Sequence, residues 1–416
     1  MIGGHMKSSF VALVAIAGLA GGMTSAQAAD LGGNCCADLE ERIAELEATT
    51  ARKGNRKVSL TVSGFVNEAV MWFDDGFESN IYQGTNEVAR TRFRFVGNAK
   101  INADWSAGYL LEFGATAARW SHMDAGTDDG GADVSVRHSA WWLANKQLGK
   151  VWVGQTSSAT DGITEINLAN TGHFATQNAN GQVGNFRESI TGLRLRQFMG
   201  GTGNNGVSDG AEIGEGTRHN VVKYESPTFA GFALSAAAGE DDLWDVALRY
   251  AGEFSGFKIA AGIGYMQWTD GTTNQYNCVT GFGVNDIKCS QLGMSGAIMH
   301  VPTGLYVHAA YGIRSDDRVP VGFDDQSTQL YIQAGIEQNF TGIGKTTLFG
   351  EYQDFDVGTT NTNFDLGMTM WGIGFNQAID AAAMDLYIRY NNWDPDVPGI
   401  ATESFQSVIA GGRISF

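Results

Sequence analysis

Residues 88–100 read VARTRFRFVGNAK, and this stretch indicates the fold because its residues alternate in character. One face carries Ala89, Thr91, Phe93, Phe95, Gly97 and Ala99. The other face carries Arg90, Arg92, Arg94, Asn98 and Lys100, with Val96 as the exception. A repeat of two residues is that of a β-strand, whose successive side chains point to opposite sides. An uncharged face and a cationic face fit a transmembrane barrel wall between lipid and water, and they also fit a half-exposed strand of a soluble sheet.

The composition is that of a long chain that lacks membrane-spanning helices. The chain has 416 residues, with 56 glycines, 5 prolines and 17% charged residues. After the N-terminal region, no segment has the roughly 18 consecutive apolar residues that a spanning helix requires. The formal net charge of −18 argues against a nucleic-acid partner, which would require a basic surface. The length predicts roughly two or three ordinary domains, or one large barrel.

Residues 1–28 have the pattern of a secretory signal peptide. Lys7 supplies a positive charge, residues 10–20 form an apolar core, and residues 26–28 read Ala-Gln-Ala, a small-x-small cleavage site. A membrane anchor is the alternative, although the apolar core is short for one. Cleavage would leave Ala29 as the new N-terminus, and the mature chain would lie outside the cytoplasm.

The four cysteines fit an oxidising compartment. Cys278 and Cys289 lie in one candidate external loop, and we predict a local disulfide between them. Cys35 and Cys36 are adjacent in sequence, which makes a bond between them unfavourable. Interchain disulfides and free thiols are therefore the two alternatives for this pair.

Residues 29–57 are predicted to form a periplasmic helical segment followed by a linker. Leu39, Ile43 and Leu46 follow spacings of four and three residues, which places them on one seam flanked by glutamates. About two heptads are too short to be stable alone. The segment is therefore either a small coiled-coil stalk of an oligomer or a single amphipathic helix packed on the body.

From residue 58 to residue 416 the sequence contains sixteen candidate strands and no helix predicted with confidence. The candidates are residues 58–73, 88–101, 106–117, 134–145, 150–156, 217–226, 232–238, 244–254, 257–268, 289–300, 305–315, 326–339, 345–354, 366–377, 384–393 and 404–416. Seven connections are tight, and the others are mostly long, polar and acidic, such as residues 74–87. An even strand number with short turns on one side and long loops on the other is typical of outer-membrane barrels. The predicted fold class is therefore all-β, a 16-stranded antiparallel transmembrane β-barrel over residues 58–416 that follows the short N-terminal helical segment.

The sequence gives little support for an enzyme. Residues 206–210 read GVSDG and match the Gly-x-Ser-x-Gly pattern, but without the strand-to-helix turn that this motif requires. The histidines are scattered without metal-ligand spacing. We therefore expect no catalytic residues, no metal site and no cofactor.

Three segments resemble the general porins of Gram-negative outer membranes. Residues 220–232, NVVKYESPTFAGF, are similar to the turn between the sixth and seventh strands of that family. Residues 412–416, GRISF, resemble the family's C-terminal assembly signal, which ends in phenylalanine, here Phe416. The acidic prefix followed by residues 58–65, VSLTVSGF, is most similar to the porins of alphaproteobacteria.

The resemblance implies a homotrimer of barrels in the outer membrane, each with a water-filled pore for the passive diffusion of ions and small hydrophilic solutes. A substrate-selective channel, for example for sugars, is the alternative. The resemblance also implies contact with lipid and lipopolysaccharide, and recognition of Phe416 by the barrel-assembly machinery. Leu39, Ile43 and Leu46 of three chains would meet in a trimer stalk. Ala29 resembles the N-terminus through which some barrels of this group are linked to peptidoglycan.

The pore constriction is predicted from charge. Its predicted residues are Arg90, Arg92, Arg94, Glu112, Arg137, Asp161 and Glu165. The first three arginines are spaced two residues apart, so neighbouring side chains start about 7 Å apart on one face. The resemblance implies that the third external loop, residues 157–216, folds inward, and we expect it to present its two carboxylates across the lumen. Such opposed charges would create a transverse field that disfavours apolar solutes. The alternative is that the arginines contact lipopolysaccharide phosphates or brace the loop.

Overall fold

The computed structural model describes residues 57–177, 180–201, 213–240, 242–269, 288–317, 319, 324–358 and 365–416. The predicted signal peptide and the residues named for the stalk and the peptidoglycan link lie outside these ranges, as does Cys278. Those hypotheses therefore stay predictions. Cys289 is fully buried and disulfide-bonded, and its pairing with Cys278 also stays a prediction. None of the helices within the described ranges is long and apolar enough to cross a membrane.

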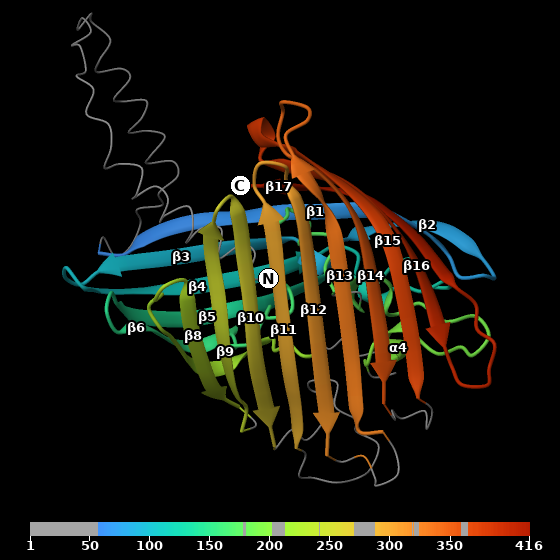
Figure 1. Cartoon of the computed structure of the whole chain (residues 1–416), viewed down its shortest axis with the longest axis horizontal. Coiled ribbons are helices and arrows are strands. Elements are labelled where there is room, and N and C mark those ends of the chain that lie inside the picture. The colour runs from blue at the N-terminus through green and yellow to red at the C-terminus, as the bar shows by residue number, and fades with distance from the viewer. Residues whose placement is uncertain are drawn as a thin grey trace, which may run out of the picture.

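The described chain is built of antiparallel strands that form one closed sheet (Figure 1). The strands are β1 (Ser59–Asp74), β2 (Ser79–Thr85), β3 (Arg92–Lys100), β4 (Trp105–Thr116), β5 (Asp133–Asn145), β6 (Gly149–Ser157), β7 (Arg218–Glu225), β8 (Phe232–Gly239), β9 (Trp244–Phe254), β10 (Phe257–Trp268), β11 (Cys289–His300), β12 (Leu305–Asp316), β13 (Gln326–Gln338), β14 (Thr346–Val357), β15 (Leu366–Ile379), β16 (Met384–Asp396) and β17 (Phe405–Ser415). The short helices are η1 (Glu87–Ala89), η2 (Trp120–His122), α3 (Asn180–Val183), α4 (Leu195–Phe198) and η4 (Asp380–Ala382). Because β17 pairs with β1, the sheet closes on itself as a barrel.

The strands β2 and β3 together occupy one position in the wall, so the barrel has sixteen wall strands. β1 pairs with β2 from Glu68 to Asp74 and with β3 from Ser59 to Phe65. The sequence predicts a loop over residues 74–87 and one unbroken strand over residues 88–101, and both predictions are partly wrong. The wall strand begins at Ser79, is interrupted after Thr85 and resumes at Arg92.

The interruption has a physical reason in the contacts of β1. The side-chain amide of Asn67 donates one hydrogen bond to the Ala89 carbonyl at 2.9 Å and another to the His173 carbonyl at 3.0 Å. The wall segment that contains η1 is therefore tied to the loop inside the barrel. Strand propensity alone cannot reveal such a contact, because its partners are 22 and 106 residues away from Asn67.

The outer face of the barrel is apolar and the inner face is largely polar. On β1, Val62, Val66 and Val70 are each more than two-fifths exposed, whereas the alternate residue Asn67 is buried. This alternation repeats around the wall and is the pattern of a transmembrane barrel, with lipid outside. In Figure 1 the strands of the near wall cross those of the far wall, as expected for strands that are tilted against the barrel axis.

Residues 158–217, here called loop 3, connect β6 to β7. The described residues of this loop, 158–177, 180–201 and 213–217, lie inside the barrel. Ile163 and Ile166 pack on β10, where a Cβ atom at Gly262 would lie 2.7 and 2.5 Å from their Cδ1 atoms. On β11, a Cβ atom at Gly293 would collide with the backbone carbonyl of Gly214. These two glycines therefore allow the loop to approach the wall closely.

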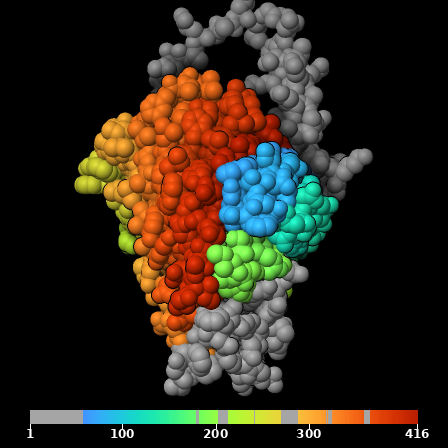
Figure 2. All heavy atoms as spheres, turned by 90° about the vertical axis from the view of Figure 1, so that its right-hand side faces the viewer, coloured from blue at the N-terminus to red at the C-terminus, as the bar shows by residue number. Residues whose placement is uncertain are grey.

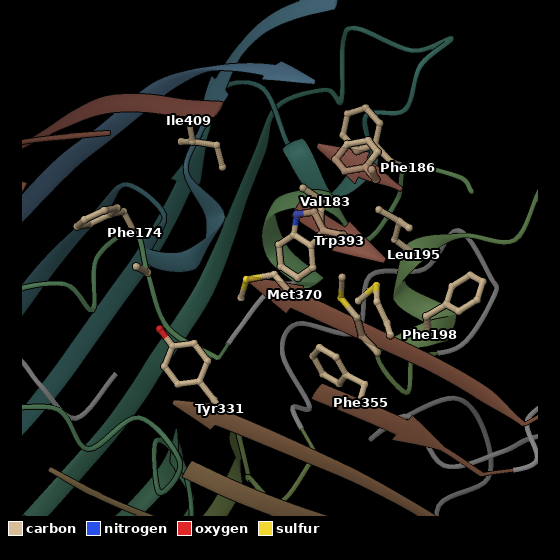
Figure 3. Packing of buried hydrophobic residues seen from close by; sticks show 14 of the residues in the cluster. Phe174, Val183, Phe186, Leu195, Phe198, Tyr331, Phe355, Met370, Trp393 and Ile409 are labelled. Atoms are coloured by element: carbon tan, nitrogen blue, oxygen red, sulfur yellow. The ribbon is translucent and has the colours of Figure 1, made fainter. Parts of the chain in front are cut away.

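The middle of loop 3 is fixed by apolar packing at the end of the barrel that carries the long loops. Figure 3 shows side chains of loop 3 against side chains of the C-terminal strands. The labelled loop residues are Phe174, Val183, Phe186, Leu195 and Phe198, and the labelled wall residues are Tyr331, Phe355, Met370, Trp393 and Ile409. The Phe186 ring centroid lies 4.7 Å from that of Phe73 and 5.0 Å from that of Phe405. The two ends and the middle of loop 3 are thus attached to the wall.

The C-terminus closes the barrel against its first strand. Phe416 donates its backbone N–H to the Gly64 carbonyl at 3.1 Å and accepts from the Gly64 N–H at 2.9 Å. A Cβ atom at Gly64 would lie 2.7 Å from the Phe416 ring, so glycine leaves room for that ring on the outer surface. In Figure 2 the blue N-terminal strands lie directly against the red C-terminal strands.

Deletion of Phe416 should lower the yield of closed barrel in the outer membrane, because it removes two hydrogen bonds at the seam and the predicted assembly signal. The measurement is the amount of heat-modifiable protein on an unheated SDS gel. Phe416→Trp, which keeps the backbone bonds and an aromatic ring, is the matched control. A deletion variant that assembles at the wild-type level would contradict the prediction.

Candidate functional site

Glu112 of β4 is the centre of a charged cluster on the inner wall, and it is fully buried. Its Oε1 accepts a hydrogen bond from Arg137 Nε at 2.8 Å, and Arg92 Nη1 lies 3.6 Å from the same oxygen. Its Oε2 accepts from Arg94 Nε at 2.7 Å. One carboxylate therefore neutralises one charge while three guanidinium groups surround it, and the cluster keeps a positive excess.

A β-bulge adds Arg137 and His138 to the cluster together. Glu112 lies opposite His138, and the next residue of β4 lies opposite Val136, so Arg137 is the extra residue. Both Arg137 and His138 are buried, whereas Val136 is 45% exposed on the outer face. His138 Nε2 lies 3.9 Å from Glu112 Oε1. A bulge re-aims side chains in this way, and strict alternation therefore missed His138.

A second group of charges lies toward the long-loop end of the same wall. Arg119 interacts with Glu87 at 3.5 Å and with Asp133 at 3.7 Å. Arg90 lies 4.0 Å from Asp133 and donates a hydrogen bond to Ser135 Oγ at 3.4 Å. Arg90 therefore faces the interior with the other two arginines of its stretch, although it precedes β3.

Asp161 lies beside this wall, whereas the sequence hypothesis had it on the opposite side of the lumen. Its carboxylate is 3.8 Å from Arg218 of β7, and its backbone carbonyl accepts from Arg249 Nη2 at 3.2 Å. Burial alone would raise the pKa of Asp161, but the Arg218 charge outweighs this effect and holds the pKa well below its usual range. Asp161 is therefore ionised, and the ion pair fixes the start of loop 3.

The ion pairs of this wall join six arginines to four carboxylates. The arginines are Arg90, Arg92, Arg94, Arg119, Arg137 and Arg218, and the carboxylates are Glu87, Glu112, Asp133 and Asp161. These ten groups thus carry two more positive than negative charges, in a chain whose formal net charge is −18. The sequence analysis did not identify Arg119 or Arg218, because neither is part of an alternating run of cations.

Arg389 of β16 attaches loop 3 to the opposite side of the barrel. It is 1% exposed and donates to Gln182 Oε1 at 2.7 Å and to the Phe174 carbonyl at 3.2 Å. Its Nε donates to Glu351 of β14. Glu351 also accepts from Tyr331 Oη at 2.7 Å. Because these groups are buried, removing one partner would leave an uncompensated charge.

Glu215 lies at the end of loop 3, where its carboxyl group contacts the start of the same loop. It accepts from the Thr164 backbone N–H at 3.1 Å and from Gln177 Nε2 at 3.4 Å. Burial, followed by the negative charges of Glu165 and Asp161, raises the pKa of Glu215 to about 8. Glu165 is itself partly buried on the first half of the loop, which is where the structure places this predicted constriction residue.

The attachment of loop 3 should weaken as the pH rises toward 8. Between the usual pKa of glutamate, 4.5, and about 8, folded Glu215 keeps a proton that the unfolded chain has lost. Stability therefore falls with rising pH over this window. Glu215→Gln should remove this dependence. Glu165→Gln should end the window at lower pH and make the total loss of stability smaller, because the pKa of Glu215 falls when the negative charge of Glu165 is removed. Amide exchange of residues 158–177, corrected for intrinsic rates, measures the effect. Identical pH profiles for wild type and Glu215→Gln would contradict it.

Comparison with known proteins places the chain among channels. The family model described as Gram-negative porin matches residues 12–298, which is more than half of the chain. No curated protein matches the sequence significantly.

Several solved structures share the fold at low sequence identity. The anion-selective porin from Comamonas acidovorans is similar with a TM-score of 0.56 and 16% identity, over 86% of this chain and 100% of that chain. The outer membrane channel DcaP of Acinetobacter baumannii has a TM-score of 0.54 and 14% identity, and OmpT of Vibrio cholerae has 0.54 and 12%. Each of these two comparisons covers 88% of this chain and 99% of the other. The chain therefore belongs to the Gram-negative porin family, and it forms an outer-membrane channel for the passive diffusion of small solutes.

Proposed function

We propose that the constriction of this channel lies between loop 3 and the arginine-bearing wall of β3, β4 and β5, and that the wall selects solutes by charge. The observation that carries this proposal is the grouping of Arg92, Arg94 and Arg137 around the single carboxylate of Glu112. Arg94 has the most exposed side chain of the three, at 28%. It is therefore the one best able to meet a passing solute.

The excess of positive charge supports a local preference for anions. Walls of low dielectric constant focus the field of a charge cluster, so a group of arginines in a narrow passage acts more strongly than it would on an open surface. The net charge of −18 is spread over the whole chain and includes the acidic external loops. The local excess, rather than the total, would set the selectivity at the narrowest point.

The combined substitution of Arg90, Arg92 and Arg94 by Gln should move the reversal potential in a salt gradient toward cation preference. The change removes three positive charges and leaves Glu112 with fewer partners, so conductance should change as well. Glu112→Gln should move the potential the opposite way, toward anions. Arg187→Gln, which removes an exposed charge outside the network, is the control. An unchanged reversal potential in the triple variant would place these arginines outside the permeation path.

We also propose that the protein is a homotrimer whose interface includes the outer face of β1 at Glu68. Glu68 lies between the outward residues Val66 and Val70, and it accepts from Thr85 Oγ1 at 2.8 Å and from Gln83 Nε2 at 3.1 Å. A carboxylate is unfavourable on a lipid-facing surface, so cover by a second subunit would stabilise it. Across the seam its partner in register is Gly412, and a small residue permits close approach. OmpT of Vibrio cholerae is described in a trimer form, which agrees with this assembly.

Glu68→Ala should lower the temperature at which the trimer separates into monomers on a semi-native gel, because it removes an interfacial polar group. Val307→Ala on the outer face of β12, 45% exposed and far from β1 in strand order, is the matched control and should have no effect. Equal dissociation temperatures for the wild type and Glu68→Ala would place the interface elsewhere on the barrel.

A further inference from the structure

A cluster of indole rings and ammonium groups lies on the inner wall near the tight-turn end of β5, β6 and β7. Trp142 pairs in register with Trp152, and Trp152 pairs with Lys223. Lys150 lies opposite Glu225, two residues from Trp152 on β6. The residues between them along the strands face outward, since Trp141 is 53%, Val151 38% and Val222 55% exposed. The cluster therefore faces the lumen.

Lys150 is held between the two indole rings. Its Nζ lies 4.4 Å from the Trp142 ring centroid and 3.8 Å from the Trp152 ring centroid. The two rings are 6.3 Å apart and nearly edge-to-face. Cation–π attraction explains why the ammonium stays at this position.

The N–H donors of the Lys150 ammonium group have no oxygen acceptor among the described wall residues. Within the described ranges the ammonium group of Lys150 makes no hydrogen bond and no ion pair, although the residue is partly buried. Glu225, the neighbouring carboxylate, instead accepts from Lys223 Nζ at 2.9 Å and from Trp152 Nε1 at 3.0 Å. An ammonium group has three N–H donors, and an aromatic face is a poor substitute for an oxygen acceptor. The site is thus a positive group with free donors beside an apolar ring surface.

This cluster lies on the same wall as the arginine network and follows it toward the tight-turn end, the end that faces the periplasm in outer-membrane barrels. Trp142 is four residues after His138 on β5, which corresponds to roughly 13 Å along the strand. The positions between the two clusters on the inner face are Ala140, whose side chain is a methyl group, and Gly154, which has no side chain. An anion that leaves the arginines would therefore meet Lys150 next.

We propose that Trp142, Lys150 and Trp152 form a binding subsite for organic anions that carry an aromatic ring, such as aromatic carboxylates. The carboxylate of the solute accepts hydrogen bonds from Lys150 Nζ, and the ring of the solute packs against the partly exposed Trp152. Lys223 adds a second positive charge nearby, and Glu225 compensates one of the two charges. This inference rests on the proposed anion-preferring channel and names a class of solute for it.

The test uses the purified full-length mature protein in planar bilayers, with benzoate as the probe at constant ionic strength. Benzoate should reduce the KCl current in a saturable manner, and it should act at lower concentration from the periplasmic side. Acetate has the charge without the ring, and benzyl alcohol has the ring without the charge. Each should be about fivefold weaker or more, because each lacks one of the two interactions.

Lys150→Met should raise the half-blocking concentration of benzoate about fivefold or more, and Lys150→Arg should restore block. Lys258→Met is the matched control, since Lys258 is also a lysine on the inner face near the tight-turn end, on β10, but has no indole beside it in the described residues. Wild-type protein that conducts KCl without saturable benzoate block overturns the subsite and leaves the channel intact. Stronger block by benzyl alcohol than by benzoate would mean that the indole rings bind neutral aromatic solutes, and it would overturn the role of Lys150. Absence of KCl conductance would overturn the channel itself.

Discussion

The pairing of every backbone N–H and C=O group within the membrane is the constraint on which the rest of this structure depends. Hydrocarbon offers no hydrogen-bond partners, so a sheet that crosses it must close on itself. Phe416 and Gly64 complete that closure through two backbone hydrogen bonds. Where the wall is interrupted between β2 and β3, side chains supply the hydrogen bonds that the strand ladder lacks. Asn67 donates its backbone N–H to Thr91 Oγ1 at 3.0 Å and its side-chain amide to the Ala89 carbonyl.

A closed wall also makes it possible to hold like charges together. Arg92 and Arg94 sit two residues apart on β3, and the bulge on β5 brings Arg137 to the same carboxylate. Mutual repulsion would separate these groups on a flexible segment, but the strand ladder fixes their backbones and Glu112 supplies the attraction. The positive charges therefore lie on one side of the lumen, and their asymmetric electrostatic field would orient a solute.

Loop 3 is held against the other walls by two different kinds of contact. Its two ends pack on β10 and β11, where glycines such as Gly293 let them approach. Its middle combines apolar packing around Phe186 with the buried hydrogen bonds of Arg389. A loop fixed at its ends and in its middle acts as part of the wall, so the width of the passage would depend on side chains such as Arg94 more than on loop motion.

The sequence alone determined the closed barrel, because the two-residue alternation and the alternating loop lengths are local properties of the chain. It also predicted that Arg92, Arg94 and Glu112 point inward, since alternate residues of a regular strand point to the same side. This alternation fails where the strand is irregular. Only the tertiary structure therefore revealed the break before Arg92 and the inward position of His138. The partners of Asp161 were equally out of reach, because Arg218 is 57 positions away and only the folding of loop 3 into the barrel brings the two charges together.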